Sequence, residues 1–355
     1  MEHSPSTIPA TTSSGWQLQP SLEAGLTNPA TLLSLSSNQV IFEYPRDPFN
    51  LAFNSRSFSP SIGDLVTQEH LRPADPDIKL YARVDYCAAR LSLLPSVFAS
   101  SGQNMFIHRQ TFQTLQPPAL QQAMSACALY CVKTPATQTL VNQVLQQNVH
   151  RLLATTNPAE SSDPHLLAAL QALLLYQLLR LFDGDIRLRA VAEADEATAM
   201  LWASELRTRV CAATSALSNS PGDWQTWLFC ESIRRTVVTT SLLRGVYKYL
   251  KTGVACPTAV GVFFTAQEGL WNAQSEIGWI KARRERLELQ VLVNAWDEMM
   301  VLATPGDVEE LGVLIMSVVW GLGATQNWLG HEGSVRYGLD GQVGTRIALS
   351  PCWHL

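Results

Sequence analysis

The chain has 355 residues, of which 46% are hydrophobic and only 15% are charged, and its formal net charge is -5. A domain that binds nucleic acid by neutralising phosphates is usually strongly basic, so this balance argues against autonomous DNA binding. The low charge on so long a chain indicates instead a large apolar interior, a sizeable surface for a partner, or both.

The cysteines favour an intracellular protein with reduced thiols. Their number, 7, is odd, and most of them lie in apolar segments. The sequence has no N-x-S/T glycosylation acceptor and no signal-peptide pattern at its N-terminus. The longest apolar stretch, 166–182, is interrupted by Gln171, Gln177 and Arg180. We therefore expect this stretch in a protein core and no association with a membrane.

Two segments precede the part of the chain with a regular apolar period. Residues 1–40 are rich in Ser, Thr and Pro and carry few charges, which predicts a disordered arm. Residues 41–76 contain several aromatic side chains but are broken by prolines, which predicts an irregular segment on the surface. From 77 to 355 the pattern predicts a single all-helical domain.

The first predicted helices follow the three-to-four spacing of an amphipathic face. Residues 77–94 show this spacing, and Pro95 is expected to end the helix. Residues 117–131 open with proline and continue with good helix formers. Residues 139–154 repeat the amphipathic spacing.

The next helix has the clearest boundaries in the sequence. Asp163 followed by Pro164 is typical of an N-cap and a proline in the first turn. The helix then runs through 166–182 and is apolar nearly all round, so it is expected at the centre of the bundle. Gly184 predicts its end, and Asp185 is expected to cap one further helix that reaches residue 210.

Four further helices are predicted at about 223–250, 258–279, 281–303 and 307–329. No segment combines the alternating period of a strand with the dipeptides of a hairpin turn. The predicted fold class is therefore all-α, a multi-helix bundle or a solenoid-like array of antiparallel helices with a disordered N-terminal arm.

Motifs for metal or cofactor binding are weak. Cys127 and Cys131 lie four apart without a second pair, which favours a structural role in the core. The G-x-G at 321–323 has no third glycine and lies in a predicted helical run, where small residues let another helix approach. Asp183 and Asp185 invite comparison with all-α prenyl-transfer enzymes, but a helix end followed by an N-cap explains them better. We expect no cofactor and no metal.

One helix contains charges that an apolar core does not explain. Trp224 and Trp227 share an apolar stripe, and Glu231, Arg234 and Arg235 follow within the same helix. Glu231 can reach both arginines, at positions i+3 and i+4. Charges in so apolar a helix are costly unless they are paired. The five residues are predicted to form either an internal structural node or a contact site for an effector or partner.

The basic residues Lys281, Arg283, Arg284 and Arg286 form a second charged group. They lie at the start of a predicted helix that continues as an apolar sequence to Trp296. A solvated helix start is favoured over a nuclear-import signal or a phosphate-binding patch.

The order of several segments resembles a known family. These segments are 106–112, 169–193, 224–237, 247–253 and 264–279, and W-x-x-W followed by E-S-x-R-R-T is the most specific part. Together they are similar to the regulatory (middle homology) region of fungal binuclear zinc-cluster transcription factors, especially regulators encoded beside secondary-metabolite gene clusters. The resemblance covers about residues 77–330.

The resemblance implies an all-helical regulatory domain in the nucleus. Its expected partners are other transcription factors or co-regulators, a second copy in a homo- or heterodimer, and a small-molecule effector. Such factors usually begin with a six-cysteine zinc cluster, whereas here no cysteine precedes Cys87. The resemblance therefore does not imply that this chain binds DNA directly through zinc. Either the protein acts through partners, or the chain as given lacks a piece that its relatives have.

Two functions follow from these observations. The first is a transcriptional regulator or co-regulator without enzymatic activity. The alternative is an all-α enzyme that holds an isoprenoid or polyketide-type substrate in an apolar cavity, which rests on the apolar interior and on the Asp183–Asp185 pair.

Overall fold

The computed structural model describes residues 78–217, 223–255, 261–286 and 288–340. These residues all belong to one unit of the chain, Asp47–Leu355. The predicted arm at 1–40 and the predicted surface segment at 41–76 lie outside the described residues.

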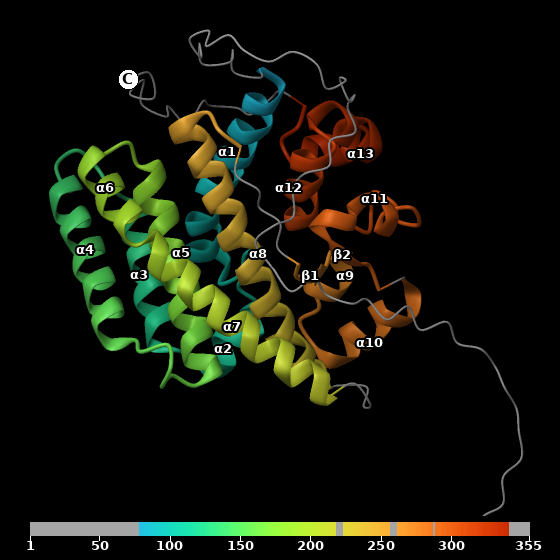
Figure 1. The fold of residues 1–355 in the computed structure, drawn as a ribbon, viewed down its shortest axis with the longest axis horizontal. Helices are drawn as coiled ribbons and strands as arrows, with labels where there is room; N and C mark the ends of the chain where they lie inside the picture. Colours follow the sequence, from blue (N-terminus) through green and yellow to red (C-terminus); the bar gives the residue numbers. More distant parts are fainter. Residues whose placement is uncertain (1–77, 218–222, 256–260, 287, 341–355) are drawn as a thin grey trace, which may run out of the picture. The chain divides into compact units, whose positions relative to one another are not determined.

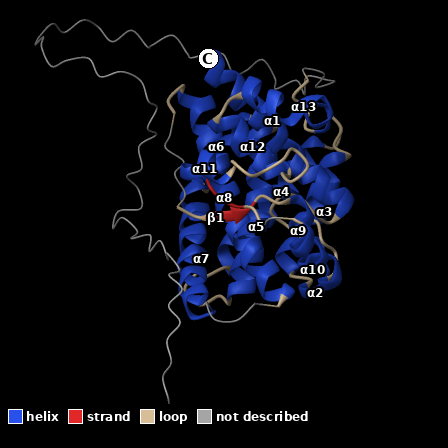
Figure 2. Ribbon diagram, turned by 90° about the vertical axis from the view of Figure 1, so that its right-hand side faces the viewer, coloured by secondary structure: helices blue, strands red, loops and turns tan. Residues whose placement is uncertain are grey.

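The described residues confirm the all-α prediction, since helices dominate and strands are short (Figures 1 and 2). The first half comprises α1 Ile78–Ser101, α2 Arg109–Leu115, α3 Pro118–Cys131, α4 Gln138–Thr155, α5 Asp163–Phe182, α6 Ile186–Ala194, α7 Glu196–Leu217 and α8 Trp224–Thr252. The second half comprises β1 Phe263–Thr265, α9 Glu268–Trp271, α10 Glu276–Glu285, β2 Gln290–Leu292, η1 Val293–Ala295, α11 Trp296–Met299, α12 Glu310–Val319 and α13 Leu322–Arg336.

Helix α5 is the central helix, as its all-round apolar sequence predicts. Every residue from Leu166 to Phe182 is buried. The helices α1, α3, α4, α6, α7 and α8 pack around it. By length and composition α5 could cross a membrane, but 94% of its apolar window is buried by the rest of the protein, as in the core helix of a bundle.

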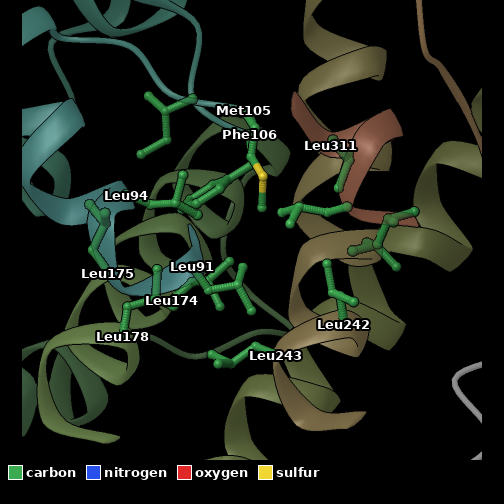
Figure 3. Packing of buried hydrophobic residues seen from close by; sticks show 14 of the residues in the cluster. Leu91, Leu94, Met105, Phe106, Leu174, Leu175, Leu178, Leu242, Leu243 and Leu311 are labelled. Carbon is green, nitrogen blue, oxygen red and sulfur yellow. The ribbon is translucent and has the colours of Figure 1, made fainter. Parts of the chain in front are cut away.

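Helices α1 and α8 connect this helical group to the C-terminal elements. In Figure 1 they lie between the green helices and the orange and red elements, and α1 packs on α12 while α8 packs on β1. Leucines from α1, α5, α8 and α12 meet in the shared core, as Figure 3 shows. One core cluster therefore extends from these helices into the C-terminal elements.

The prediction that Pro95 ends the first helix is wrong. Helix α1 continues through Pro95 to Ser101. A proline inside a helix removes one backbone hydrogen bond and costs about 3 kcal/mol. Leu94 and Phe98, on either side of Pro95, are completely buried, and the packing of this face offsets that cost.

The boundaries around α5 were predicted in part. Gly184 has a positive φ of 95°, and the Asp185 side chain caps α6 by accepting hydrogen bonds from the Arg187 and Leu188 amides. The residue before α5, however, is Ser162, and Asp163 is the first helical residue. Its Oδ1 accepts a hydrogen bond of 3.0 Å from Arg209 Nη1 of α7 instead of serving as the cap.

The helix predicted from Asp185 to residue 210 is in fact two helices. The chain turns at Asp195, between α6 and α7. The Asp195 carboxylate accepts a 2.7 Å hydrogen bond from Arg180, and Gln177 Nε2 donates to the Ala192 carbonyl at 2.9 Å. Both donors come from α5. The break between α6 and α7 is therefore accompanied by contacts with another helix, and the local sequence pattern does not show such contacts.

The helices predicted at 258–279 and 281–303 are wrong in their middle parts. Strands β1 and β2 pair antiparallel there, with Phe264 opposite Val291. Both of these side chains are fully buried. The helical parts of the two predicted segments are the short elements α9, α10, η1 and α11. The small sheet lies among the helices in Figure 2, and β1 packs on α8. Thr265 of β1 donates a hydrogen bond to Glu231 of α8.

The helix predicted at 307–329 is also interrupted. Gly321 has a φ of 90° and separates α12 from α13, so the G-x-G spans a helix boundary, and Gly323 lies in the first turn of α13. A Cβ atom at Gly321 would come within 2.7 Å of Arg83 Nη2. Arg83 Nη1 also donates a 3.1 Å hydrogen bond to the Val318 carbonyl. Glycine thus allows both the backbone conformation and the close approach of this arginine.

Candidate functional site

The charged residues predicted on α8 lie at the boundary between this helix and the C-terminal elements. Asp223 caps α8, and its side chain accepts a 2.7 Å hydrogen bond from the Thr226 amide. The i, i+3 and i+4 spacing then places Arg234 and Arg235 beside Glu231. Together with Glu309 at the start of α12, Glu231, Arg234 and Arg235 form a group that we call the Glu231 cluster.

Glu231 is completely buried and accepts hydrogen bonds from three residues. Arg234 donates to Oε2 through Nε at 3.0 Å and Nη2 at 2.8 Å, and Arg235 Nε donates to Oε1 at 2.9 Å. Thr265 of β1 donates its amide to Oε1 at 2.8 Å and its hydroxyl to Oε2 at 3.2 Å. This extensive bonding compensates for the removal of the carboxylate from water.

Arg235 is completely buried and connects α8 to four other parts of the chain. Its Nη1 donates to the Met105 carbonyl at 2.9 Å, and its Nη2 donates to the Thr265 carbonyl at 2.5 Å. Nη1 also lies 2.9 Å from Glu309 Oε1. The guanidinium carbon lies 4.1 Å from the centre of the Trp271 ring, which is a cation–π contact.

The formal charges of the Glu231 cluster sum to zero, with two carboxylates and two guanidinium groups. Burial raises the pKa of the Glu309 carboxyl, and the nearby charge of Arg235 opposes that rise. The Glu309 side chain also caps α12 by accepting a hydrogen bond from the Leu311 amide at 3.0 Å. The cluster therefore joins α8 to β1 by charged hydrogen bonds and α8 to α12 by the ion pair of Arg235 with Glu309.

Trp224 and Trp227 lie in a separate apolar group, which we call the tryptophan cluster. Its buried members are Trp224, Leu228, Leu270, Trp271, Ala273 and Trp279. The rings of Trp227 and Trp279 are 5.6 Å apart. The structure thus brings the three predicted charged residues together and places the two predicted tryptophans beside them. Trp271 belongs to this cluster and also contacts Arg235, so the two groups are continuous.

His108 is a central residue that the sequence reasoning missed. It is completely buried, and its ring packs edge-on against Trp271 at 5.2 Å and Trp224 at 6.5 Å. Its Nδ1 accepts a hydrogen bond of 3.2 Å from the Gln110 amide and so caps α2. Burial, with smaller contributions from the charges of Arg235 and Arg109, lowers the pKa of His108 from 6.5 to about 4. The imidazole is neutral at physiological pH.

The depressed pKa of His108 predicts a loss of stability in mild acid. The unfolded chain binds this proton near pH 6.5, whereas the folded chain binds it only near pH 4. The free energy of unfolding therefore has its full value above pH 6.5 and decreases as the pH falls from 6.5 to 4. The expected contribution is about 3 kcal/mol at pH 4. His108→Asn keeps a side-chain acceptor for the cap and should flatten the dependence between pH 7 and pH 5 in urea unfolding. Equal slopes for both proteins would contradict the assignment.

An open cavity of about 470 Å³ adjoins the Glu231 cluster. It lies where the end of α1, the segment before α2, α9, α12 and α13 meet. Glu309 and Trp271 line the cavity and also contact Arg235. The sequence reasoning did not predict this cavity, although segment 106–112, one of those similar to the family, borders it.

The acidic pair at 183–185 has structural partners. Asp183 Oδ1 accepts a 2.6 Å hydrogen bond from the Tyr130 hydroxyl and pairs with Lys133, whereas Asp185 caps α6. Within the described ranges, no three His, Cys, Asp or Glu side chains are placed to hold a metal ion. The two cysteines of α3 are free thiols. Cys127 is buried, as a core role predicts, whereas Cys131 is exposed, so that prediction is wrong for Cys131.

The apolar cavity between α5, α6, α7 and α8 is small. Its volume is about 30 Å³, roughly that of one water molecule in the liquid. Leu174, Leu181 and Leu243 are among the side chains that line it. This cavity does not accommodate an isoprenoid or a polyketide chain, because such ligands occupy cavities of about 300 Å³ or more.

The basic residues of the α10 region are exposed and mostly paired. Lys281 lies 3.8 Å from Glu285, Arg283 lies 3.4 Å from Glu288, and Arg286 lies 2.7 Å from Asp307. Helix α10 ends at Glu285, so the predicted continuation to Trp296 is wrong. Carboxylates beside these three residues offset their positive charge.

The fold and the site define an all-α domain whose buried charges are paired with one another beside an open polar cavity. The chain is 45% identical over 347 residues to the transcription factor gsfR2 of Penicillium aethiopicum, and the match covers 92% of this chain and 82% of the relative. The chain therefore belongs to this family of fungal transcription factors. No family model and no solved structure matches the chain.

Proposed function

We propose that this transcriptional regulator controls a fungal secondary-metabolite gene cluster from the nucleus, and that the described helical domain acts through protein contacts. The observation that carries the proposal is the 45% identity to a transcription factor over 92% of the chain. The ordered segments at 106–112 and 224–237 add the resemblance to the middle homology region of secondary-metabolite regulators.

Protein contacts are favoured over phosphate contacts by the charge of the chain. The net charge of the chain is -5. In the α10 region Lys281, Arg283 and Arg286 lie beside carboxylates, which weakens their attraction for phosphate. Other transcription factors, co-regulators or a second copy of the chain are the proposed partners.

The enzyme alternative is not favoured. The carboxylates of Asp183 and Asp185, on which it rests, bind Lys133, Tyr130 and the start of α6. The small apolar cavity lies among α5 to α8 and has room for about one water molecule. An Asp183→Asn/Asp185→Asn double variant that supports normal transcription would agree with the regulator, and loss of a metabolite without any transcript change would favour the enzyme.

Deletion of the gene, followed by transcript profiling of its chromosomal neighbours, tests the regulatory function. The transcripts of the neighbouring biosynthetic genes should change together, and reintroduction of the wild-type gene should restore them. An allele with the exposed substitution Arg151→Gln on α4 is a matched control that should also restore them, because this side chain is exposed. Unchanged neighbouring transcripts after deletion would contradict the proposal.

A binding experiment with the purified chain tests the protein-contact mechanism separately. The chain alone should bind cluster promoter DNA no more tightly than an unrelated sequence at physiological salt. Tight and specific binding by the purified chain alone would overturn this part of the proposal and leave the regulatory function intact.

A further inference from the structure

We propose that the open cavity beside the Glu231 cluster is a binding site for a small organic acid, with Arg109 as the residue that holds its carboxylate. This proposal rests on the proposed regulatory function only for its biological meaning, since it supplies the effector for that regulator. The binding itself can be tested without any transcriptional measurement.

The cavity has the size and lining of a site for a small polar ligand. Its volume is about 470 Å³, within the range of about 300 to 1,000 Å³ that small-molecule sites occupy. Val97 and Met105 contribute apolar surface, and most of the other lining side chains are charged or polar. Because it is open to the surface, a ligand can enter without unfolding the domain.

The charges that line the cavity leave one cation without a carboxylate. Arg90 Nη2 lies 2.5 Å from Glu310, and Arg336 Nη1 donates to Glu268 at 2.9 Å. Glu309 lies against Arg235 in the neutral Glu231 cluster. Among the described residues, no carboxylate pairs with the sixth charged side chain, Arg109. Three arginines and three glutamates line the cavity, and because Glu309 pairs with Arg235 outside the lining, Arg109 is the lining cation left for the carboxylate of a ligand.

Arg109 is held in an orientation that suits a carboxylate. Its Nε donates a 3.0 Å hydrogen bond to the Ser101 carbonyl across the turn at Gly102, which has a φ of 70°. Within the described part of the chain, no acceptor binds either terminal nitrogen of Arg109, so both can donate to one ligand. A planar guanidinium that is already fixed at Nε binds a carboxylate with two parallel hydrogen bonds at a small entropic cost.

Asn104 supplies a second observation at the same cavity. Its Oδ1 accepts hydrogen bonds from the Phe106 amide at 3.0 Å and the Ile107 amide at 2.8 Å, which fixes the orientation of the side-chain amide. Its Nδ2 is buried and has no hydrogen-bond partner in the structure. Asn104 is 6% exposed and lines the cavity. An unpaired buried donor is unfavourable, and a ligand acceptor that reached it would supply the missing hydrogen bond.

Ligand-observed fluorine NMR on the full-length chain tests the proposal with 4-fluorobenzoate and its neutral isostere 4-fluorobenzamide. The acid should bind with a Kd on the order of 1 mM, and the amide should bind at least about tenfold more weakly, since only the acid can neutralise Arg109. Arg109→Gln should weaken the acid at least about tenfold and leave the amide unchanged. Arg151→Gln on α4 removes one exposed arginine far from the cavity lining and should change neither affinity.

A second variant guards against an indirect effect of Arg109→Gln, because Arg109 also bonds to the end of α1. Val97 is 38% exposed at the cavity, so Val97→Glu adds a negative charge there and leaves Arg109 in place. It should weaken the acid and spare the amide. Absence of saturable acid binding, or equal affinities in wild type and both variants, overturns the proposal. So does an acidic peptide that binds through Arg109 where no small acid does. None of these outcomes bears on the gene-deletion result.

Discussion

Replacing Arg235 with alanine is expected to lower the free energy of unfolding by about 3 kcal/mol. The substitution removes the guanidinium that neutralises both Glu231 and Glu309, and both carboxylates remain buried. It also leaves the Met105 and Thr265 carbonyls without this donor. Urea unfolding followed by tryptophan fluorescence measures the loss.

Arg234→Ala is the matched control for this prediction. Arg234 lies next to Arg235 on α8 and binds the same carboxylate, but it is 8% exposed, and its hydrogen bonds go to Glu231. Glu231 keeps Arg235 and Thr265 in this variant, so the expected loss is smaller, about 1 to 2 kcal/mol. Equal losses for the two arginines would show that the connections of Arg235 to other elements add nothing to stability.

Glu231→Gln is expected to have the largest effect, a loss of about 4 kcal/mol. The new side chain has nearly the same shape, but it leaves the cluster with a net positive charge inside the core. Its amide nitrogen also faces donors where the carboxylate oxygen accepted hydrogen bonds from Arg234 and Arg235. The same urea experiment applies, with circular dichroism to show whether the variant is folded in the absence of denaturant.

The control for Glu231→Gln is Glu205→Gln on α7. Glu205 also pairs with an arginine at i+4, Arg209, at 2.9 Å, but its side chain is 40% exposed. Water and salt screen this pair, and Arg209 keeps its contact with Asp163. The expected loss is less than about 0.5 kcal/mol. If the two glutamate variants lost the same amount of stability, burial would not be the cause of the effect at Glu231.

Local sequence patterns determined the helical class, the central position of α5 and the pairing within α8. Nearly continuous apolar residues predict a helix that is buried on all sides, and α5 is buried from Leu166 to Phe182. The cap at Asp185 and the i, i+3 and i+4 spacing of Glu231, Arg234 and Arg235 act over one turn of helix. Contacts within one helical turn can be predicted from the sequence because the residues involved are neighbours along the chain.

The tertiary structure alone decided which distant groups complete the site. Glu231 meets Thr265, which is 34 positions away, and Arg235 meets Met105, which is 130 positions away. The paired strands β1 and β2, the neutral state of His108 and the cavity at Arg109 depend in the same way on which elements pack together. The stability of these features depends on burial and on hydrogen bonds between distant segments. Neither can be predicted from the spacing of residues along one helix.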